Sequence, residues 1–246
     1  MAIEKLLECY LDLKSILGDN IEPFESVQLI EEYRKYWRPE KVKTILLAES
    51  HVFTTKSDRA IKLENLINLP GYPNDYAKFV YCLAYGERMV TNDRAHPSRD
   101  GTPQFWKNFY SCMNPVDSNN DFWPILSKTP YPKRIENKIN LLKQMKKSGV
   151  WLVDASIVAL YNQGKKPSSN TLSKTIQVSW RGYTKQVVNE ASPKHVIIIG
   201  NGVARNIENE LRSIVGDNYT IIAQPNAHLS ASEHLSNFKK YYALCC

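Results

Sequence analysis

Side chains that can do chemistry follow the predicted strands at the points where those strands end. A carboxylate, a hydroxyl and an imidazole come directly after the apolar run 43–48, and another carboxylate lies near the end of the run 150–155. An amide and an imidazole lie in the segment 224–230, directly after the run 219–223. Carboxylates and imidazoles can orient or deprotonate water, and hydroxyls and amides can donate hydrogen bonds to a leaving group. These candidates are Glu49, Ser50, His51, Asp154, Gln224 and His228.

The elements that must position these side chains alternate along the chain. Apolar runs at 43–48, 150–155, 195–199 and 219–223 are typical of buried strands, and helical patterns separate them. This alternation predicts an α/β fold with three layers, α/β/α, around a central four-stranded parallel sheet. Ligands of such sheets bind beyond the carboxyl ends of the strands. We therefore expect the candidate side chains at one edge of the sheet.

Apolar residues at three- and four-residue spacing predict the helices that cover the sheet. Many prolines interrupt the stretch 54–135, so only short helices are expected inside it. No internal repeat, linker or low-complexity segment divides the sequence, and we expect a single domain, 1–246, whose N-terminal helices (about 1–40) pack on the α/β core. The predicted helices are 3–17, 26–37, about 75–85, about 103–113, 134–147, 180–190, 203–215 and 231–243.

Composition and charge narrow the class of partner. The formal net charge is +7, and this excess favours a polyanionic partner such as DNA. No stretch approaches the ~20 apolar residues that span a bilayer, and the N-terminus lacks the basic and apolar regions of a signal peptide. We expect no membrane association and a cytoplasmic location, or a nuclear one in a eukaryote.

Two further patterns argue against metals and dinucleotides. The five cysteines show no C-x-x-C spacing and are odd in number, which favours free thiols in a reducing compartment over a metal or iron–sulfur site. Gly200 and Gly202 follow a predicted strand, but Arg205 occupies the third glycine position of a dinucleotide-binding motif. That motif is therefore rejected.

The segments around the four strands resemble, in the same order, those of the uracil-DNA glycosylase superfamily. AESH (48–51) stands where the superfamily has its water-activating motif, and GVWLVDA (149–155) is similar to its Gly-Val-Leu-Leu-Leu-Asn-Ala. SWRGYTKQVV (179–188) resembles Gly-Trp-Glu-x-Phe-Thr-Asp-x-Val-Ile, and GNGVA (200–204) resembles Trp-Gly-x-x-Ala. QPNAHLS (224–230) lies where His-Pro-Ser-Pro-Leu-Ser stands.

The resemblance covers about residues 43–243 and implies both fold and activity. It implies a uracil-DNA glycosylase-like domain that flips a damaged or deaminated base out of DNA and hydrolyses its N-glycosidic bond, as in base excision repair. It implies DNA as the partner, a monomer, and neither cofactor nor metal.

The first two loops supply the water-positioning and base-reading groups. Glu49, with Ser50 and His51, would position the water, although Ser50 replaces the family's activating Asp and His51 replaces its Pro. Asp154 stands where the family has a base-reading Asn. An ionised carboxylate only accepts hydrogen bonds, so Asp154 would suit a base edge with donors, and uracil is then not the preferred base. The alternative is that Asp154 caps the segment after its strand.

The remaining candidates would bind the base and the strand. Gln224 replaces the family's catalytic His, and His228 would either take over that role or, like Leu229, fill the gap left by a flipped base. Asn226 would form a turn or contact phosphate, and Phe79 or Tyr81 would stack on the base, unless both belong to the core. The expected DNA contacts are Lys165, Lys166, Arg181, Leu229 and Ser230.

Three hypotheses about function stay open at this point. The leading one is a DNA glycosylase-like hydrolase. Because the signature Asp and His are both replaced, a non-catalytic DNA-binding or lesion-sensing protein on the same fold is the alternative. A third is a hydrolase of free nucleosides or nucleotides without affinity for DNA.

Overall fold

Four parallel strands form the centre of the molecule. The computed structural model describes residues 2–64, 69–92, 104–162, 167–224 and 228–246. The sheet has the order β2-β1-β3-β4, and every neighbouring pair is parallel. The predicted α/β class, with helices on both sides of a four-stranded parallel sheet, is confirmed. The strands are β1 (Thr44–Ala48), β2 (Val150–Asp154), β3 (His195–Ile199) and β4 (Tyr219–Ile222).

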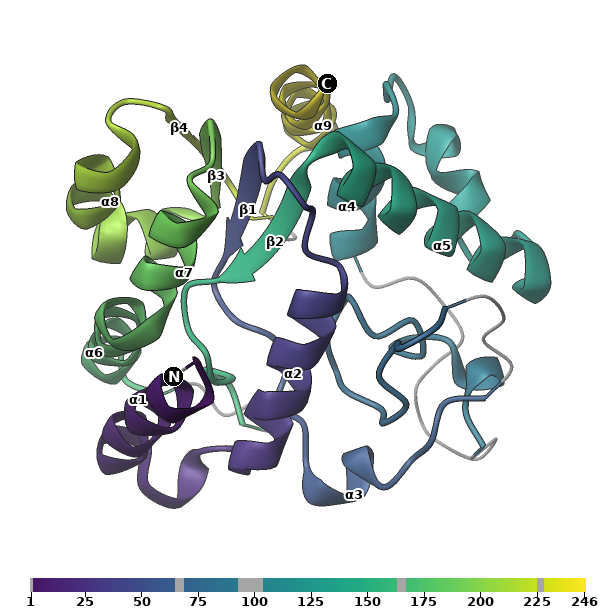
Figure 1. The fold of residues 1–246 in the computed structure, drawn as a ribbon. Helices are drawn as coiled ribbons and strands as arrows, with labels where there is room; N and C mark the ends of the chain where they lie inside the picture. The colour runs from purple at the N-terminus through teal and green to yellow at the C-terminus, as the bar shows by residue number, and fades with distance from the viewer. Residues whose placement is uncertain (1, 65–68, 93–103, 163–166, 225–227) are drawn as a thin grey trace.

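Helices flank the sheet on two sides (Figure 1), with α6, α7 and α8 on one side and α4, α5 and α9 on the other. The α-helices are α1 (Ala2–Leu17), α2 (Phe24–Tyr36), α3 (Lys56–Arg59), α4 (Phe105–Met113), α5 (Tyr131–Ser148), α6 (Ser169–Ser179), α7 (Lys185–Ala191), α8 (Asn201–Val215) and α9 (Ala231–Cys245). Shorter turns of helix are η1 (Gly18–Asn20), η2 (Arg88–Val90), η3 (Asn119–Ile125) and the π-helical η4 (Trp180–Thr184).

The register of β1 and β2 brings the first two candidate loops together. Ala48 pairs with Asp154, and every residue of both strands is buried, as continuous apolar runs predict. The pairing continues past the strands, since Ser156 N donates to the Glu49 carbonyl at 3.0 Å. The segments that begin at Glu49 and at Ala155 therefore lie side by side at the carboxyl ends of the strands.

Two helix predictions were wrong in part. The segment 75–85 contains no helix. Leu83 N donates to the hydroxyl of Tyr72 at 2.8 Å instead of to a carbonyl one helical turn earlier. Most of the apolar side chains of this segment are buried, so contacts with the core determine its path. The helix predicted over 180–190 begins earlier, at Ser169. Ser168 caps it by accepting from Thr171 N, and α6, η4 and α7 then follow without a break.

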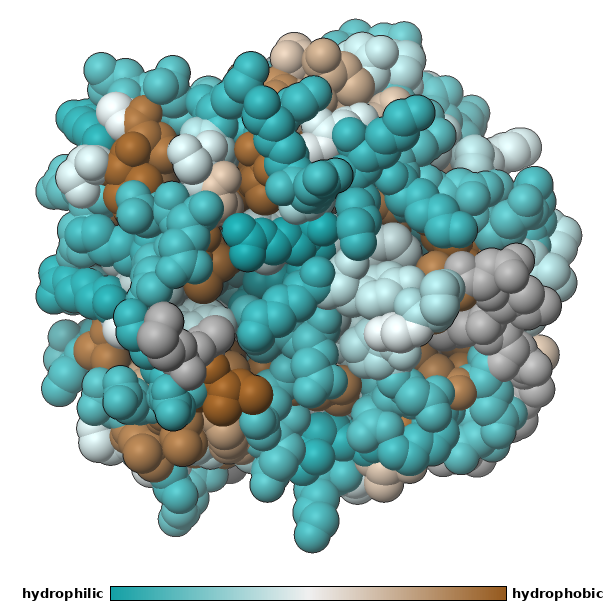
Figure 2. Space-filling view, viewed as in Figure 1, coloured by the Kyte–Doolittle hydropathy of each residue, from teal (hydrophilic) through white to brown (hydrophobic). Residues whose placement is uncertain are grey.

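The first helix buries one face and exposes another apolar one. Leu6 and Leu13 are buried in a smaller apolar cluster that α1 forms with residues of the η4 region. Ile3, Leu7 and Leu11, spaced four residues apart, are exposed. Figure 2 shows this side of the molecule as mostly hydrophilic, with apolar patches among the polar ones, including one where α1 lies. Within the residues that the structure describes, no helix is long and apolar enough to cross a bilayer.

Candidate functional site

A small cavity, here called the inner cavity, lies beyond the carboxyl ends of β1 and β2. Its volume is about 150 Å³. The sequence predicted four of its lining residues, which come from three separate segments. These four are Ser50, His51, Phe79 and Asp154.

A larger neighbour, here called the outer cavity, has a volume of about 280 Å³. Ser50, His51 and Phe105 line both cavities, which makes the two contiguous. Glu49 and Gln224 line the outer cavity but not the inner one. The two contiguous cavities therefore bring together predicted residues that follow the first and fourth strands with Asp154 of the second. Phe105, at the first position of α4, was not predicted as a site residue.

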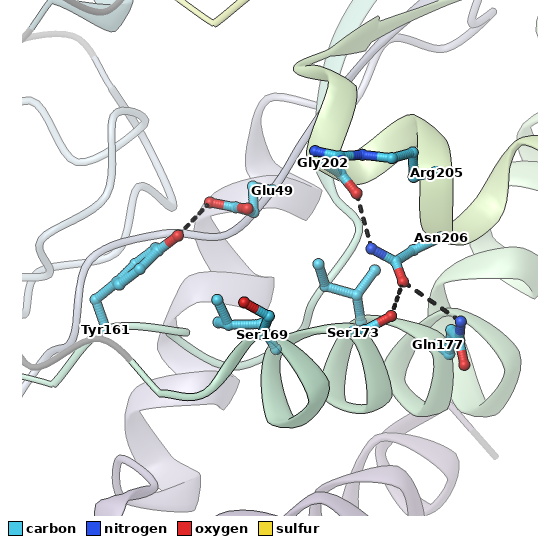
Figure 3. A pocket seen from close by; sticks show the side chains of 10 residues that line it. Glu49, Tyr161, Ser169, Ser173, Gln177, Gly202, Arg205 and Asn206 are labelled. Carbon is cyan, nitrogen blue, oxygen red and sulfur yellow. Dashed lines mark hydrogen bonds between the residues drawn. The ribbon is translucent and has the colours of Figure 1, made fainter.

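The Glu49 carboxylate lies between the outer cavity and a third, polar pocket (Figure 3). It is half-buried, and Tyr161 donates its hydroxyl proton to Oε2 at 3.2 Å. Burial, with the charge and hydrogen bond of Glu49, raises the pKa of Tyr161 to about 12. Tyr161 therefore stays a neutral donor at physiological pH and fixes Glu49. Apart from its place in the loop after β2, no sequence pattern indicated Tyr161.

Asp154 is tied into a buried network instead of facing solvent. Its Oδ2 lies 3.3 Å from Nη2 of Arg34 and 3.6 Å from Nδ1 of His51, and its side chain is almost completely buried. The guanidinium of Arg34 also bonds Glu31, and Tyr183 donates its hydroxyl proton to Oε1 of Glu31 at 2.9 Å. Asp154 thus lines the inner cavity and supports the fold through its contact with Arg34 rather than through a bond to the segment after β2, and its role in base reading stays a prediction.

His51 is held between two carboxylates. Its Nε2 lies 2.6 Å from Oε1 of Glu22, and neither side chain is exposed to solvent. Burial lowers the pKa of His51, but Glu22 and Asp154 outweigh burial and raise it to about 9. His51 is therefore a fixed imidazolium at neutral pH rather than the acid–base group that the sequence predicted. As a cation it can favour negative charge that develops on a base in the inner cavity.

Three residues of this network were missed at the sequence level. Glu22 accepts hydrogen bonds from the backbone N–H groups of Thr54 and Ala159, which belong to the loops after β1 and β2. Glu31 and Arg34 are three residues apart on the buried face of α2. A charged pair within an otherwise apolar helix face is a signal for a buried ion pair, and it was available in the sequence.

The two predicted stacking residues have different surroundings. Phe79 lines the inner cavity, and its ring makes an edge-on contact with His51, with centroids 6.2 Å apart. Tyr81 is buried in the core, where its hydroxyl accepts a hydrogen bond from Leu152 N at 2.8 Å. Both side chains are thus buried in the apolar core, and Phe79 also lines the inner cavity, so its stacking on a base stays a prediction.

The structure describes only some of the residues that were expected to contact DNA. Arg181 is exposed, but its Nε lies 2.6 Å from Oε1 of Glu210, so its charge is already paired. Ser230 caps α9 by accepting from Glu233 N, and this local bond accounts for its position. His228 is exposed and Leu229 is half-buried. Lys165, Lys166 and Asn226 lie outside the described residues.

No protein-family model, curated protein or solved structure matches this chain. The geometry and chemistry of the cavities therefore carry the functional argument. In the described part of the chain, no group of three or more His, Cys, Asp or Glu side chains is arranged to hold a metal ion.

Proposed function

We propose that this chain is a DNA glycosylase-like hydrolase that removes a damaged or deaminated base after flipping it out of DNA. The observation that carries the proposal is the inner cavity, where Phe79 and Asp154 line one half-open space beyond β1 and β2. A flipped base needs a pocket with a surface to stack on and a polar group that reads its edge. Glu49 lines the adjoining outer cavity, where the sugar would lie.

The volume of the inner cavity favours a base with a single ring. The cavity measures about 150 Å³, and an apolar protein cavity of about 150 Å³ accommodates one benzene ring. A pyrimidine has one ring and a purine has two. A damaged pyrimidine therefore fits within the inner cavity alone, whereas a purine would extend into the contiguous outer cavity.

Asp154 favours a pyrimidine edge that donates hydrogen bonds. A carboxylate only accepts, and the contacts of Asp154 with Arg34 and His51 both use Oδ2, which leaves Oδ1 for a ligand. The exocyclic amine of a damaged cytosine supplies the donor that Oδ1 needs. Uracil has an N–H donor between two carbonyl oxygens, and a carboxylate cannot donate a hydrogen bond to those oxygens.

The residues of the outer cavity suit the hydrolysis step. Tyr161 occupies Oε2 of Glu49, so Oε1 can hold a water molecule against the sugar. The water oxygen bonds to C1′ as the N-glycosidic bond breaks, and the base leaves with the bonding electron pair and takes up a proton. The amide of Gln224, which lines the same cavity, can donate a hydrogen bond to the departing base.

A non-catalytic DNA-binding or lesion-sensing protein is the second candidate. The observation that favours it is the burial of His51, whose Nε2 contacts Glu22 and whose Nδ1 lies 3.6 Å from Asp154 without a hydrogen bond, so the ring is held inside the protein. Ser50, at the position of the family's activating Asp, is not a base by itself. This candidate predicts DNA binding that weakens steeply with salt, without base release.

Release of bases from labelled oligonucleotides tests the proposal. The panel contains uracil, oxidised and alkylated cytosines, hypoxanthine and xanthine, in single and double strands. We expect wild type to release a damaged pyrimidine and Glu49→Gln to be slower by about 100-fold or more. The matched control is Glu25→Gln, because Glu25 is an exposed carboxylate at the start of α2 and should leave release unchanged. DNA binding without base release would favour the second candidate. If wild type neither binds DNA nor releases a base, both candidates are rejected.

A further inference from the structure

The largest cavity described here is the third, polar pocket, which lies between α6 and α8. Its volume is about 390 Å³, within the range of small-molecule sites. Glu49 and Tyr161 form the wall that it shares with the outer cavity, and Leu172 and Ile176 of α6 supply apolar surface. We call it the α6–α8 pocket. The base-removal reaction proposed above uses only its shared wall.

One side chain of this pocket is largely engaged in internal hydrogen bonds, since the amide oxygen of Asn206 accepts two and its amide nitrogen donates one. Asn206 donates to the Gly202 carbonyl at 2.7 Å and accepts from both Ser173 and Gln177 (Figure 3). Asn206 therefore braces α6 against α8 and fixes the shape of the pocket. The groups left for a ligand are on other residues.

Two acceptor oxygens of the pocket are left for a ligand. Oε2 of Glu49 accepts from Tyr161, which leaves Oε1 facing the start of α8, where a side chain added at Gly202 would come within 3.7 Å of it. Gln177 donates through its amide nitrogen, so its amide oxygen is left to accept. A ligand that satisfies these two oxygens must bring hydroxyl or amine donors.

The rim of the pocket carries the opposite charge. Arg205 is exposed, and its Nε donates to the Asn201 carbonyl at 3.2 Å, which orients the guanidinium. Among the described residues Arg205 makes no ion pair, so its charge is available to an anion. Guanidinium groups bind phosphate with paired, charge-assisted hydrogen bonds.

We propose that the α6–α8 pocket binds a ribonucleoside monophosphate, with the ribose hydroxyls on Glu49 and Gln177 and the phosphate on Arg205. A DNA strand suits the pocket less well. Its sugars have no free hydroxyl within the chain to donate to Glu49 and Gln177. The apolar surface of Leu172 and Ile176 can cover one face of the sugar or base. This site is separate from the inner cavity but shares Oε1 of Glu49 with the proposed hydrolysis step, so a bound ribonucleotide displaces the water held there. Its binding is measured without DNA and does not depend on base release.

Calorimetric titration of the full chain tests the proposal directly. The ligands are AMP and CMP, their 2′-deoxy counterparts, adenosine, inorganic phosphate and a single-stranded DNA. We expect the ribonucleotides to bind, and the 2′-deoxynucleotides, adenosine and phosphate each to bind at least about tenfold more weakly. Arg205→Ala should weaken the ribonucleotides about tenfold or more.

Two further variants separate ligand contact from folding. Arg212→Ala is the matched control, because Arg212 is an exposed arginine near the other end of α8, and it should leave ribonucleotide binding unchanged. Gly202→Ala adds a methyl group 3.7 Å from Glu49 Oε1 without strain, so the folded protein should bind ribonucleotides several-fold more weakly. Equal binding of ribo- and deoxynucleotides, tighter binding of DNA, no effect of Arg205→Ala, or no ribonucleotide binding at millimolar concentration would each overturn the proposal.

Discussion

The Glu22 carboxylate lies 2.6 Å from Nε2 of His51, and both side chains are fully buried. The same carboxylate accepts backbone hydrogen bonds from Thr54 N at 3.1 Å and from Ala159 N at 2.7 Å. Glu22 thus joins the segment before α2 to the loops after β1 and β2. These loops carry Glu49 to Val52 and Tyr161, so one buried carboxylate outside the cavities holds much of the wall of the candidate site.

Removal of that carboxylate should strongly destabilise the fold. Glu22→Ala leaves the His51 imidazolium and two backbone donors buried without a partner, at a cost of about 3–5 kcal/mol in the free energy of unfolding. Glu25→Ala, three residues away and exposed, should change that free energy by at most about 0.5 kcal/mol. Urea unfolding measures both, and a Glu22→Ala effect as small as that of Glu25→Ala would contradict the role given to Glu22.

The raised pKa of His51 predicts a loss of stability in mild alkali. The pKa rises from 6.5 to about 9 on folding, so the folded state binds the proton more tightly. The resulting stabilisation, on the order of 3 kcal/mol, is fully present below pH 6.5 and is lost as the pH rises through 9. Lys138 acts in the opposite direction. Burial lowers its pKa to about 8, so its contribution to the free energy of unfolding increases as the pH rises above 8.

The difference between wild type and His51→Gln isolates the histidine. We expect this difference in unfolding free energy to shrink between pH 6.5 and 9, because only wild type loses the proton. NMR titration of the imidazole should show a midpoint near pH 9. A midpoint near or below 6.5 would mean that Glu22 and Asp154 do not hold His51 as a cation.

Substitution by alanine should have opposite effects on stability at the two glycines near the start of α8. Gly200 has a φ of +105°, and a Cβ there would lie 2.9 Å from Cγ of Gln224, so Gly200→Ala should destabilise the protein by more than about 1 kcal/mol. Gly202 has an ordinary helical conformation and room for a methyl group, so Gly202→Ala should be neutral or stabilising by up to about 1 kcal/mol. Thermal unfolding of the pair checks this, and equal effects would contradict the packing of Gln224 against Gly200.

Asp154→Asn should change both stability and base preference. Loss of the charge that faces Arg34 leaves a buried guanidinium with Glu31 alone, which should lower the unfolding free energy by about 3 kcal/mol. An amide both donates and accepts, so any remaining base release should shift toward uracil. Release from matched duplexes with uracil or a damaged cytosine measures the ratio, and an unchanged ratio would show that Asp154 does not read the base.

Periodicity and strand-end reasoning predicted the sheet and much of the cavity wall. Continuous apolar runs marked all four strands, and the parallel arrangement placed Ser50, His51 and Asp154 around one cavity. Gln224, which follows β4, also lines the outer cavity with Glu49, although β3 lies between β1 and β4 in the sheet.

The rest depended on contacts that no local pattern encodes. Glu22 acts across 29 residues on His51 and across 137 residues on Ala159. The irregular segment 75–85 is set by contacts such as that of Leu83 N with Tyr72, so a helical pattern there was misleading. The protonation of His51 likewise follows from two carboxylates that lie far away in the sequence.

Comparison of base release from two duplexes that differ only in the target base tests the central claim most directly. One duplex carries an oxidised cytosine and the other hypoxanthine, and single-turnover rates are measured with wild type. Because the inner cavity has the volume of a single ring, we predict release of the oxidised cytosine and at least about 100-fold slower release of hypoxanthine. Equal rates, or faster release of hypoxanthine, would contradict the assignment of the inner cavity as the base pocket.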